Sequence, residues 1–114
     1  MPMLYRRLLD EATLSADTAP DLSAALDLGD YREIHLVLTV TSAGDGDAAK
    51  LVVRHAAVND EAAYLDFETP VSVSLGTTGS TWFHVDTFTR WVSWFVSGTL
   101  SREAVVTLDL VAKP

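Results

Sequence analysis

Apolar and polar residues alternate along several stretches of this chain, and this period of two restricts its fold more than any other feature. The alternation is clearest in residues 34–41, 71–75 and 104–112, where every second side chain is Ile, Leu, Val or Ala. Successive side chains of a β-strand point to opposite faces of the sheet. Each of these stretches therefore predicts a strand with one face in the core.

The remaining stretches rich in β-branched and aromatic residues predict further strands at 50–58, 62–68, 81–87 and 90–97. Residues 4–15 fit a helix as well as a strand, and a strand is favoured because no other segment would provide a helical layer. Pro70 is expected to break the chain between two strands, and residues 76–80 to form a loop. The chain is thus predicted to be all-β, a single-domain antiparallel β-sandwich over residues 1–114, jelly-roll-like, with about seven to nine strands.

The charge of the chain argues against two kinds of partner. Eight Lys and Arg residues stand against 16 Asp and Glu residues, which gives this acidic chain a net charge of −8. Nucleic acids and anionic membranes are both bound largely through basic residues, so neither is expected as a partner. Cysteine is absent, so the fold is expected to form without disulfides or thiolate metal sites.

The N-terminal residues contain no long apolar run, which predicts neither a signal peptide nor a membrane span. The expected location is therefore the cytoplasm, or a virion or other particle assembled there. The sequence also contains neither a G-x-S-x-G nucleophile motif nor a G-x-x-x-x-G-K phosphate-binding loop. The chain is accordingly predicted to be no enzyme and to use no cofactor.

Three histidines, His35, His55 and His84, lie on different predicted strands and could gather around a metal ion with a carboxylate such as Asp86. An H-x-H pair would place two imidazoles on one face of a strand, and this chain has none. Each histidine is explained equally well as a solvated residue at the rim of the sandwich. No metal site is therefore predicted, and removal of metal ions should leave thermal stability unchanged.

Two acidic loops provide the other candidates for a bound ion or ligand. Asp45 and Asp47 lie in one loop, and Asp60 and Glu61 follow Asn59 in another. Calcium prefers such oxygen ligands, and the two loops would form a site if they met at one end of the sandwich. The spacing of an EF-hand is missing, however, and acidic turns are common in a chain this negative.

The aromatic residues concentrate in residues 82–95, around the strand from Arg90 to Gly98. Val92, Trp94 and Val96 alternate with Trp91, Ser93 and Phe95, so both faces of this strand carry large side chains. The sequence does not decide which set faces the core, because a shift of one residue exchanges them. If the set with Trp94 is buried, then Trp91 and Phe95, with Trp82 alongside, form an exposed interaction surface. The alternative is that both faces of the strand are covered, so that all three tryptophans belong to the core.

A family resemblance accompanies this pattern of strands and turns. The resemblance is carried by residues 26–31, 34–42, 51–54, 90–92 and 96–99. These segments resemble small jelly-roll or sandwich proteins of tailed bacteriophages and phage-like particles. Such proteins decorate a capsid or lie at the head–tail junction. The resemblance implies a virion component, with a shell-forming protein or further copies of itself as partners.

We therefore expect a non-enzymatic structural protein that associates with itself, as a homo-oligomer, or decorates a larger protein shell. The alternative is a carbohydrate-binding module. A β-sandwich can present Trp and Tyr rings that stack on sugars while nearby Asp, Asn and His side chains bind the hydroxyls. The two hypotheses differ in whether the exposed aromatic side chains are free on a single copy or buried against protein.

Overall fold

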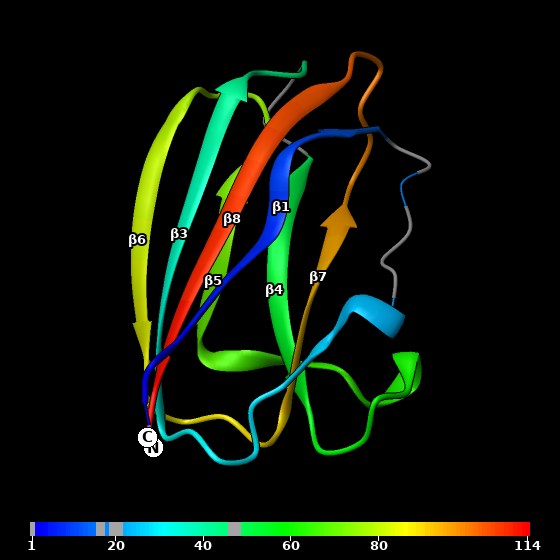
Figure 1. Cartoon of the computed structure of the whole chain (residues 1–114). Coiled ribbons are helices and arrows are strands. Elements are labelled where there is room, and N and C mark those ends of the chain that lie inside the picture. The colour runs from blue at the N-terminus through cyan, green and yellow to red at the C-terminus, as the bar shows by residue number, and fades with distance from the viewer. Residues whose placement is uncertain (1, 16–17, 19–21, 46–48) are drawn as a thin grey trace.

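The computed structural model of the chain describes residues 2–15, 18, 22–45 and 49–114. These residues form two four-stranded antiparallel sheets that pack face to face (Figure 1). In order across the sheet, sheet A consists of β1 (Leu4–Leu14), β8 (Ala104–Lys113), β3 (Glu33–Ser42) and β6 (Gly79–Val85). Sheet B consists of β2 (Leu26–Asp27), β7 (Trp91–Ser97), β4 (Lys50–Ala56) and β5 (Leu65–Ser74). The predicted antiparallel β-sandwich is confirmed.

Two short 3-10 helices, η1 (Leu22–Ala24) and η2 (Glu61–Ala63), lie side by side near one end of sheet B (Figure 1). The Asn59 side chain ties them together by donating a hydrogen bond to the Leu22 carbonyl oxygen at 2.8 Å. No helix in the described ranges has the length and apolar character needed to cross a membrane.

The strand order is that of a jelly roll. Each strand of the first half is hydrogen-bonded to its counterpart in the second half, which gives the pairs β1–β8, β2–β7, β3–β6 and β4–β5. The chain therefore follows the path of one long hairpin that is rolled into two sheets. This path places segments far apart in the sequence, such as β1 and β8, next to each other in sheet A.

The core between the sheets is mainly aliphatic, as the alternation predicts. In β3 the residues with even numbers, from Ile34 to Val40, are buried, and in β8 the even-numbered residues from Ala104 to Ala112 are buried as well. Leu36 lies directly opposite Leu110 in the register of these two strands. Because the two strands present their apolar residues to the same side, the odd-numbered residues of both strands form the outer face of sheet A.

The structure decides the register of the aromatic strand β7. Val92 is fully buried, and Trp94 and Val96 pack against the core. Trp91 and Phe95 therefore lie on the outer face of sheet B. Of the alternatives that the sequence left open for this strand, the observed one has Trp94 toward the core and Trp91 and Phe95 outside it.

The strand prediction for the N-terminal segment is also confirmed, because β1 covers Leu4–Leu14. Its pairing with β8 shifts twice, between Arg7 and Leu9 and again between Leu9 and Ala12. Glu11, in the second irregularity, has a positive φ of 46°. Such β-bulges interrupt the period of two, which explains why the sequence of this segment fits neither strand face well.

Several predicted boundaries differ from the observed ones. The strand predicted at 62–68 begins only at Leu65, because η2 covers Glu61–Ala63. The chain does not break at Pro70, because β5 continues through it from Leu65 to Ser74. The pairing of β5 with β4 jumps from Val53–Val71 to Arg54–Asp66, so the proline lies in a bulge of an edge strand, where its missing N–H costs no ladder hydrogen bond. The loop predicted at residues 76–80 is shorter, since β6 begins at Gly79 with a φ of 140°.

Candidate interaction surface and histidine cluster

The outer face of sheet A carries functional side chains in rows that run across its strands. Two neighbouring rows are Tyr5–Val111–His35–His84 and Arg7–Asp109–Val37–Trp82, in the order β1, β8, β3, β6. No described helix lies over these rows, since η1 and η2 are beside sheet B (Figure 1). This face therefore meets solvent directly.

A group of apolar side chains on this face is exposed, and we name it the Trp82 surface. Its members are Met3, Tyr5, Val37, Trp82 and Val111. Met3, Tyr5 and Trp82 are 64%, 54% and 63% exposed, whereas the two valines are half-buried between them. A groove runs across the surface and is also lined by His35, Asp109 and Lys113. Contiguous apolar groups of this kind on a soluble protein commonly mark a contact site.

Trp82 is held in place although most of its ring is exposed. Its ring is parallel to that of His35 within 3°, with ring centroids 5.6 Å apart. The indole Nε1–H donates a hydrogen bond to Nδ1 of His35 at 3.3 Å. A partner that covers the ring would thus lose little side-chain entropy on binding.

A charged network lies next to the Trp82 surface. Arg7 forms an ion pair with Asp109, with a distance of 2.8 Å between Nε and Oδ1, and the Tyr5 hydroxyl donates a hydrogen bond to the same carboxylate at 2.9 Å. The hydrogen bond from Arg7, together with that from Tyr5, lowers the pKa of Asp109 below its usual value. Arg7 and Asp109 therefore remain charged at neutral pH and fix the orientation of the Tyr5 ring.

Beyond His35 on the same face, one carboxylate oxygen joins two imidazoles. Oε1 of Glu33 lies 2.8 Å from Nε2 of His35 and 3.0 Å from Nε2 of His84. The two imidazole rings stack with centroids 4.7 Å apart. The hydrogen bond from His35, followed by the charges of neighbouring basic groups, lowers the pKa of Glu33.

Sequence reasoning missed Glu33, and it considered Asp86 as the carboxylate instead. The available signal was the E-x-H spacing of Glu33 and His35, which places both side chains on one face of β3. The third member, His84, requires the β3–β6 register, which pairs it with His35 and which the sequence does not reveal. Among the described residues, His55 lies apart from this cluster, on β4 of sheet B, where its Nδ1 accepts a hydrogen bond from the Thr89 backbone N–H.

The rings on the outer face of sheet B differ from Trp82 because the chain itself covers them. The Arg90 guanidinium lies over Trp91 at 5.6 Å, and that of Arg54 lies over Phe95 at 5.2 Å. The ring of Tyr64 meets Phe95 edge-on at 5.3 Å. The three residues predicted to form one surface are therefore divided, with Trp82 on one side of the sandwich and the other two half-buried on the opposite side.

Each of these two arginines forms an ion pair with an aspartate. Arg90 makes two hydrogen bonds to the Asp27 carboxylate, at 2.9 and 2.7 Å, and Arg54 makes one to Asp66 at 3.0 Å. The side-chain hydrogen bond from Arg90 is the main cause that lowers the pKa of Asp27 from 3.8 to about 2. Asp27 thus stays ionised and keeps the guanidinium over Trp91 down to acidic pH.

The two acidic loops do not meet. The loop with Asp45 precedes β4 and the loop with Asp60 and Glu61 follows it, so they lie at opposite ends of this strand (Figure 1). Asp45 accepts hydrogen bonds from the backbone N–H groups of Ser101 and Arg102 and from the Ser101 hydroxyl. Asp60 accepts one from the Ala62 N–H and caps η2. The fourth predicted residue, Asp47, lies outside the described residues.

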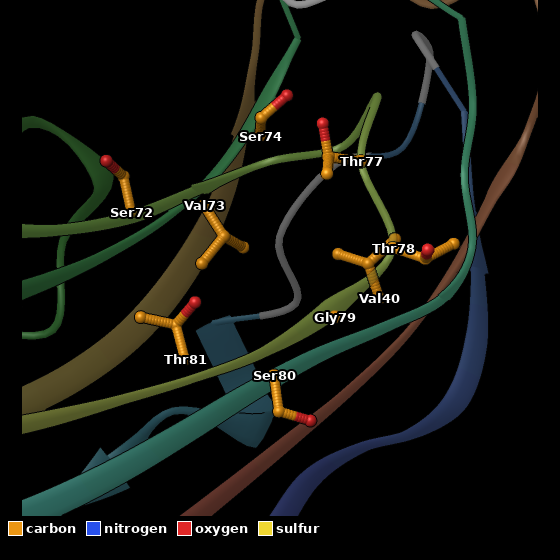
Figure 2. Close-up of a pocket in the computed structure, with 9 residues that line it drawn as sticks. All are labelled: Val40, Ser72, Val73, Ser74, Thr77, Thr78, Gly79, Ser80 and Thr81. Carbon is orange, nitrogen blue, oxygen red and sulfur yellow. The ribbon is translucent and has the colours of Figure 1, made fainter.

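A polar hollow lies at the turn between β5 and β6. Figure 2 shows the side chains of Ser72 and Ser74 from β5 and of Thr77, Thr78 and Thr81 from the turn and β6 around it. Its lining contains hydroxyls and two valines but neither an aromatic ring nor a titratable side chain. This lining offers no general base, and no ring on which a sugar could stack.

No protein-family model matches the chain, and no curated protein does. Three solved structures that resemble it are a protein of Bacillus endospore appendages, which form disulfide-linked pili, the SPBc2 prophage-derived protein YomS, and the K1 cleaved adhesin domain of Lys-gingipain from Porphyromonas gingivalis W83. Their sequence identities are 14%, 11% and 14%, and their TM-scores 0.49, 0.45 and 0.45. The alignments cover 97%, 95% and 77% of this chain and 87%, 95% and 57% of the respective neighbours. Similarities at this level assign neither a family nor a function.

Proposed function

We propose that this chain is a non-enzymatic structural protein that associates with further copies of itself through the Trp82 surface. The observation that carries the proposal is the exposed Trp82 ring, which is held in place by His35 and flanked by the exposed Met3 and Tyr5. A second occupant of the same surface would be a larger protein shell that the chain decorates, in the cytoplasm or on a virion-like particle.

The apolar area on this surface favours weak, reversible association. Fully burying a large apolar side chain is worth roughly 1.5–3 kcal/mol. Met3, Tyr5 and Trp82 are 54–64% exposed, so six such side chains in a two-fold contact contribute on the order of 5–11 kcal/mol. Association itself costs on the order of 4–15 kcal/mol. The balance favours association by at most about 7 kcal/mol, which corresponds to a Kd of roughly 10 μM. Pairs of copies are thus expected at tens of micromolar or above, and stronger assembly requires several contacts at once.

The charges around the Trp82 surface permit contact between identical copies. Arg7 and Lys113 supply two positive charges there, and Glu33 and Asp109 supply two negative ones. The surroundings of this surface are therefore balanced although the whole chain has a net charge of −8. A two-fold contact brings the same patch of both copies together, so a patch with both signs can complement itself.

Light scattering on a concentration series tests this proposal. Trp82→Ser should lower the average mass at tens to hundreds of micromolar and leave the far-UV circular dichroism unchanged. Leu65→Ser is the matched control, because Leu65 is 64% exposed but lies on the edge strand β5 of sheet B. If the wild-type chain is monomeric over the whole series, self-association is refuted. A lower average particle mass for Leu65→Ser but not for Trp82→Ser would place the contact on sheet B.

A carbohydrate-binding role is the second candidate, and one observation favours it. The exposed Trp82 ring lies in a groove with His35, Asp109 and Lys113, so an aromatic platform is combined with hydrogen-bonding groups. Sugar rings stack on such platforms while polar groups bind the hydroxyls.

Titration of the intrinsic tryptophan fluorescence with a panel of mono- and oligosaccharides distinguishes the two roles. A sugar-binding protein would show a saturable change that disappears in Trp82→Ser. The assembly role predicts no such change up to millimolar sugar, together with a fluorescence that depends on protein concentration.

A further inference from the structure

Glu33, His35 and His84 bring three metal-ligating atoms to one point on the outer face of sheet A. These atoms are Oε1 of the glutamate and one ring nitrogen from each histidine, and all lie within 4.8 Å of one another. We infer that the three side chains form a binding site for a divalent transition-metal ion of the zinc type. This inference goes beyond the assembly role and does not depend on it.

Two of the three pairs of donor atoms already have nearly the spacing that a metal ion requires. Ligand bonds of 2.0–2.1 Å around a tetrahedral zinc ion place neighbouring donor atoms about 3.3 Å apart. The Glu33 oxygen now lies 2.8 Å from His35 Nε2 and 3.0 Å from His84 Nε2, so each of these two pairs has to separate by a few tenths of an ångström. The ring nitrogens of the two histidines lie within 4.8 Å of each other and have to adopt the same spacing of about 3.3 Å. The fourth coordination position would face solvent, because the three side chains are 22–41% exposed.

The donor set selects the class of ion. Two imidazoles and one carboxylate suit zinc and its late first-row neighbours, whereas calcium and magnesium prefer all-oxygen sites. Lys113 lies opposite Glu33 in the pairing of β3 with β8, and its positive charge opposes cation binding and lowers the affinity.

The hydrogen bond from Trp82 gives the site a distinctive property. Because His35 Nδ1 accepts the indole N–H, the imidazole proton of neutral His35 resides on Nε2, where it faces Glu33. A metal ion on Nε2 displaces this proton to Nδ1, so that Nδ1 becomes a donor and can no longer accept from Trp82. Metal binding and the Trp82–His35 hydrogen bond therefore exclude each other.

Calorimetric titration of the tag-free chain with zinc chloride tests the inference. We expect saturable binding with a stoichiometry of one, together with a change in tryptophan fluorescence. Magnesium or calcium at the same concentration should bind far more weakly. His84→Ala should weaken zinc binding by roughly 100-fold or more, because it leaves only two ligands. His55→Ala, which removes a histidine outside the cluster, should leave zinc affinity unchanged.

Trp82→Phe provides the sharpest readout, because it keeps an aromatic ring and removes the competing N–H. Zinc should bind this variant about 2- to 10-fold more tightly than the wild type, as expected for the loss of one competing hydrogen bond. Circular dichroism of each variant controls for folding. Glu33→Gln removes the third ligand with a near-isosteric side chain and should weaken zinc binding, as His84→Ala does. Absence of saturable zinc binding by the wild type overturns the inference. The inference is also overturned if His84→Ala and Glu33→Gln bind zinc as tightly as the wild type does.

Discussion

The two outer faces of this sandwich carry similar aromatic side chains in different surroundings. On sheet B, Arg90 covers Trp91, and Arg54 and Tyr64 cover Phe95. On sheet A, Trp82 lies parallel to His35 and remains 63% exposed. Part of the difference arises from the connections, because Tyr64 belongs to the segment between β4 and β5, which folds back toward sheet B, whereas no described segment lies over the rows of sheet A (Figure 1).

An aromatic residue on the outer face of a strand is therefore not by itself an interaction site. Its role depends on whether the same chain supplies cover. Phe95 contributes to the stability of the single copy, and Trp82 remains available to a partner. Three substitutions should separate the two faces, and the first is expected to have the largest effect.

Phe95→Ala should destabilise the chain by about 2 kcal/mol. Core Phe-to-Ala substitutions cost about 3–5 kcal/mol, and the expected value is lower because Phe95 is half-buried under Arg54 and Tyr64. Urea unfolding followed by circular dichroism measures the loss, with Phe95→Leu as a control that keeps most of the apolar volume. A change below about 0.5 kcal/mol, typical of an ordinary surface site, would show that the cover on sheet B is not stabilising.

Trp82→Ala should change the free energy of unfolding by less than about 1 kcal/mol, since it removes an exposed ring and a single long hydrogen bond. The same urea titration, at a concentration where the protein is monomeric, provides the value. A loss as large as that of Phe95→Ala would make Trp82 a structural residue and remove the contrast between the faces.

Lowering the pH should weaken the hold of Arg90 over Trp91, because Asp27 becomes protonated. Its folded-state pKa is lowered from 3.8 to about 2, so ionised Asp27 stabilises the fold above pH 3.8, and this contribution is lost as the pH falls toward 2. Between pH 5 and pH 2 the melting temperature of Asp27→Asn should therefore fall by less than that of the wild type. Parallel curves for the two proteins would mean that the pair of Asp27 and Arg90 adds nothing to stability.

The fold could be predicted from the sequence because alternation is a local signal. The even-numbered residues of β3 and β8 face the core as expected, and even the irregular β1 was correctly assigned as a strand. The error at Pro70 had a physical cause. A proline can remain inside an edge strand at a bulge, and whether a strand lies at the edge depends on the sheet order, which the sequence does not show.

The candidate sites were less predictable because they depend on contacts between distant segments. The sequence identified Trp82, Trp91 and Phe95 as a group, but the division between two sheets follows from the jelly-roll topology. In the same way, Glu33 and His84 are 51 positions apart and meet only through the register of β3 and β6. Local periodicity determines which side chains of one strand share a face, whereas their neighbours from other strands are set by topology.

Fluorine NMR of the chain labelled with 5-fluorotryptophan shows which tryptophan lies at the contact between copies. The chain has three tryptophans, and Trp82→Phe, Trp91→Phe and Trp94→Phe assign the three resonances. Over a dilution series from several hundred to a few micromolar, the account predicts that the Trp82 resonance shifts or broadens with concentration while those of Trp91 and Trp94 stay constant. A concentration-dependent Trp91 resonance beside a constant Trp82 resonance would contradict it.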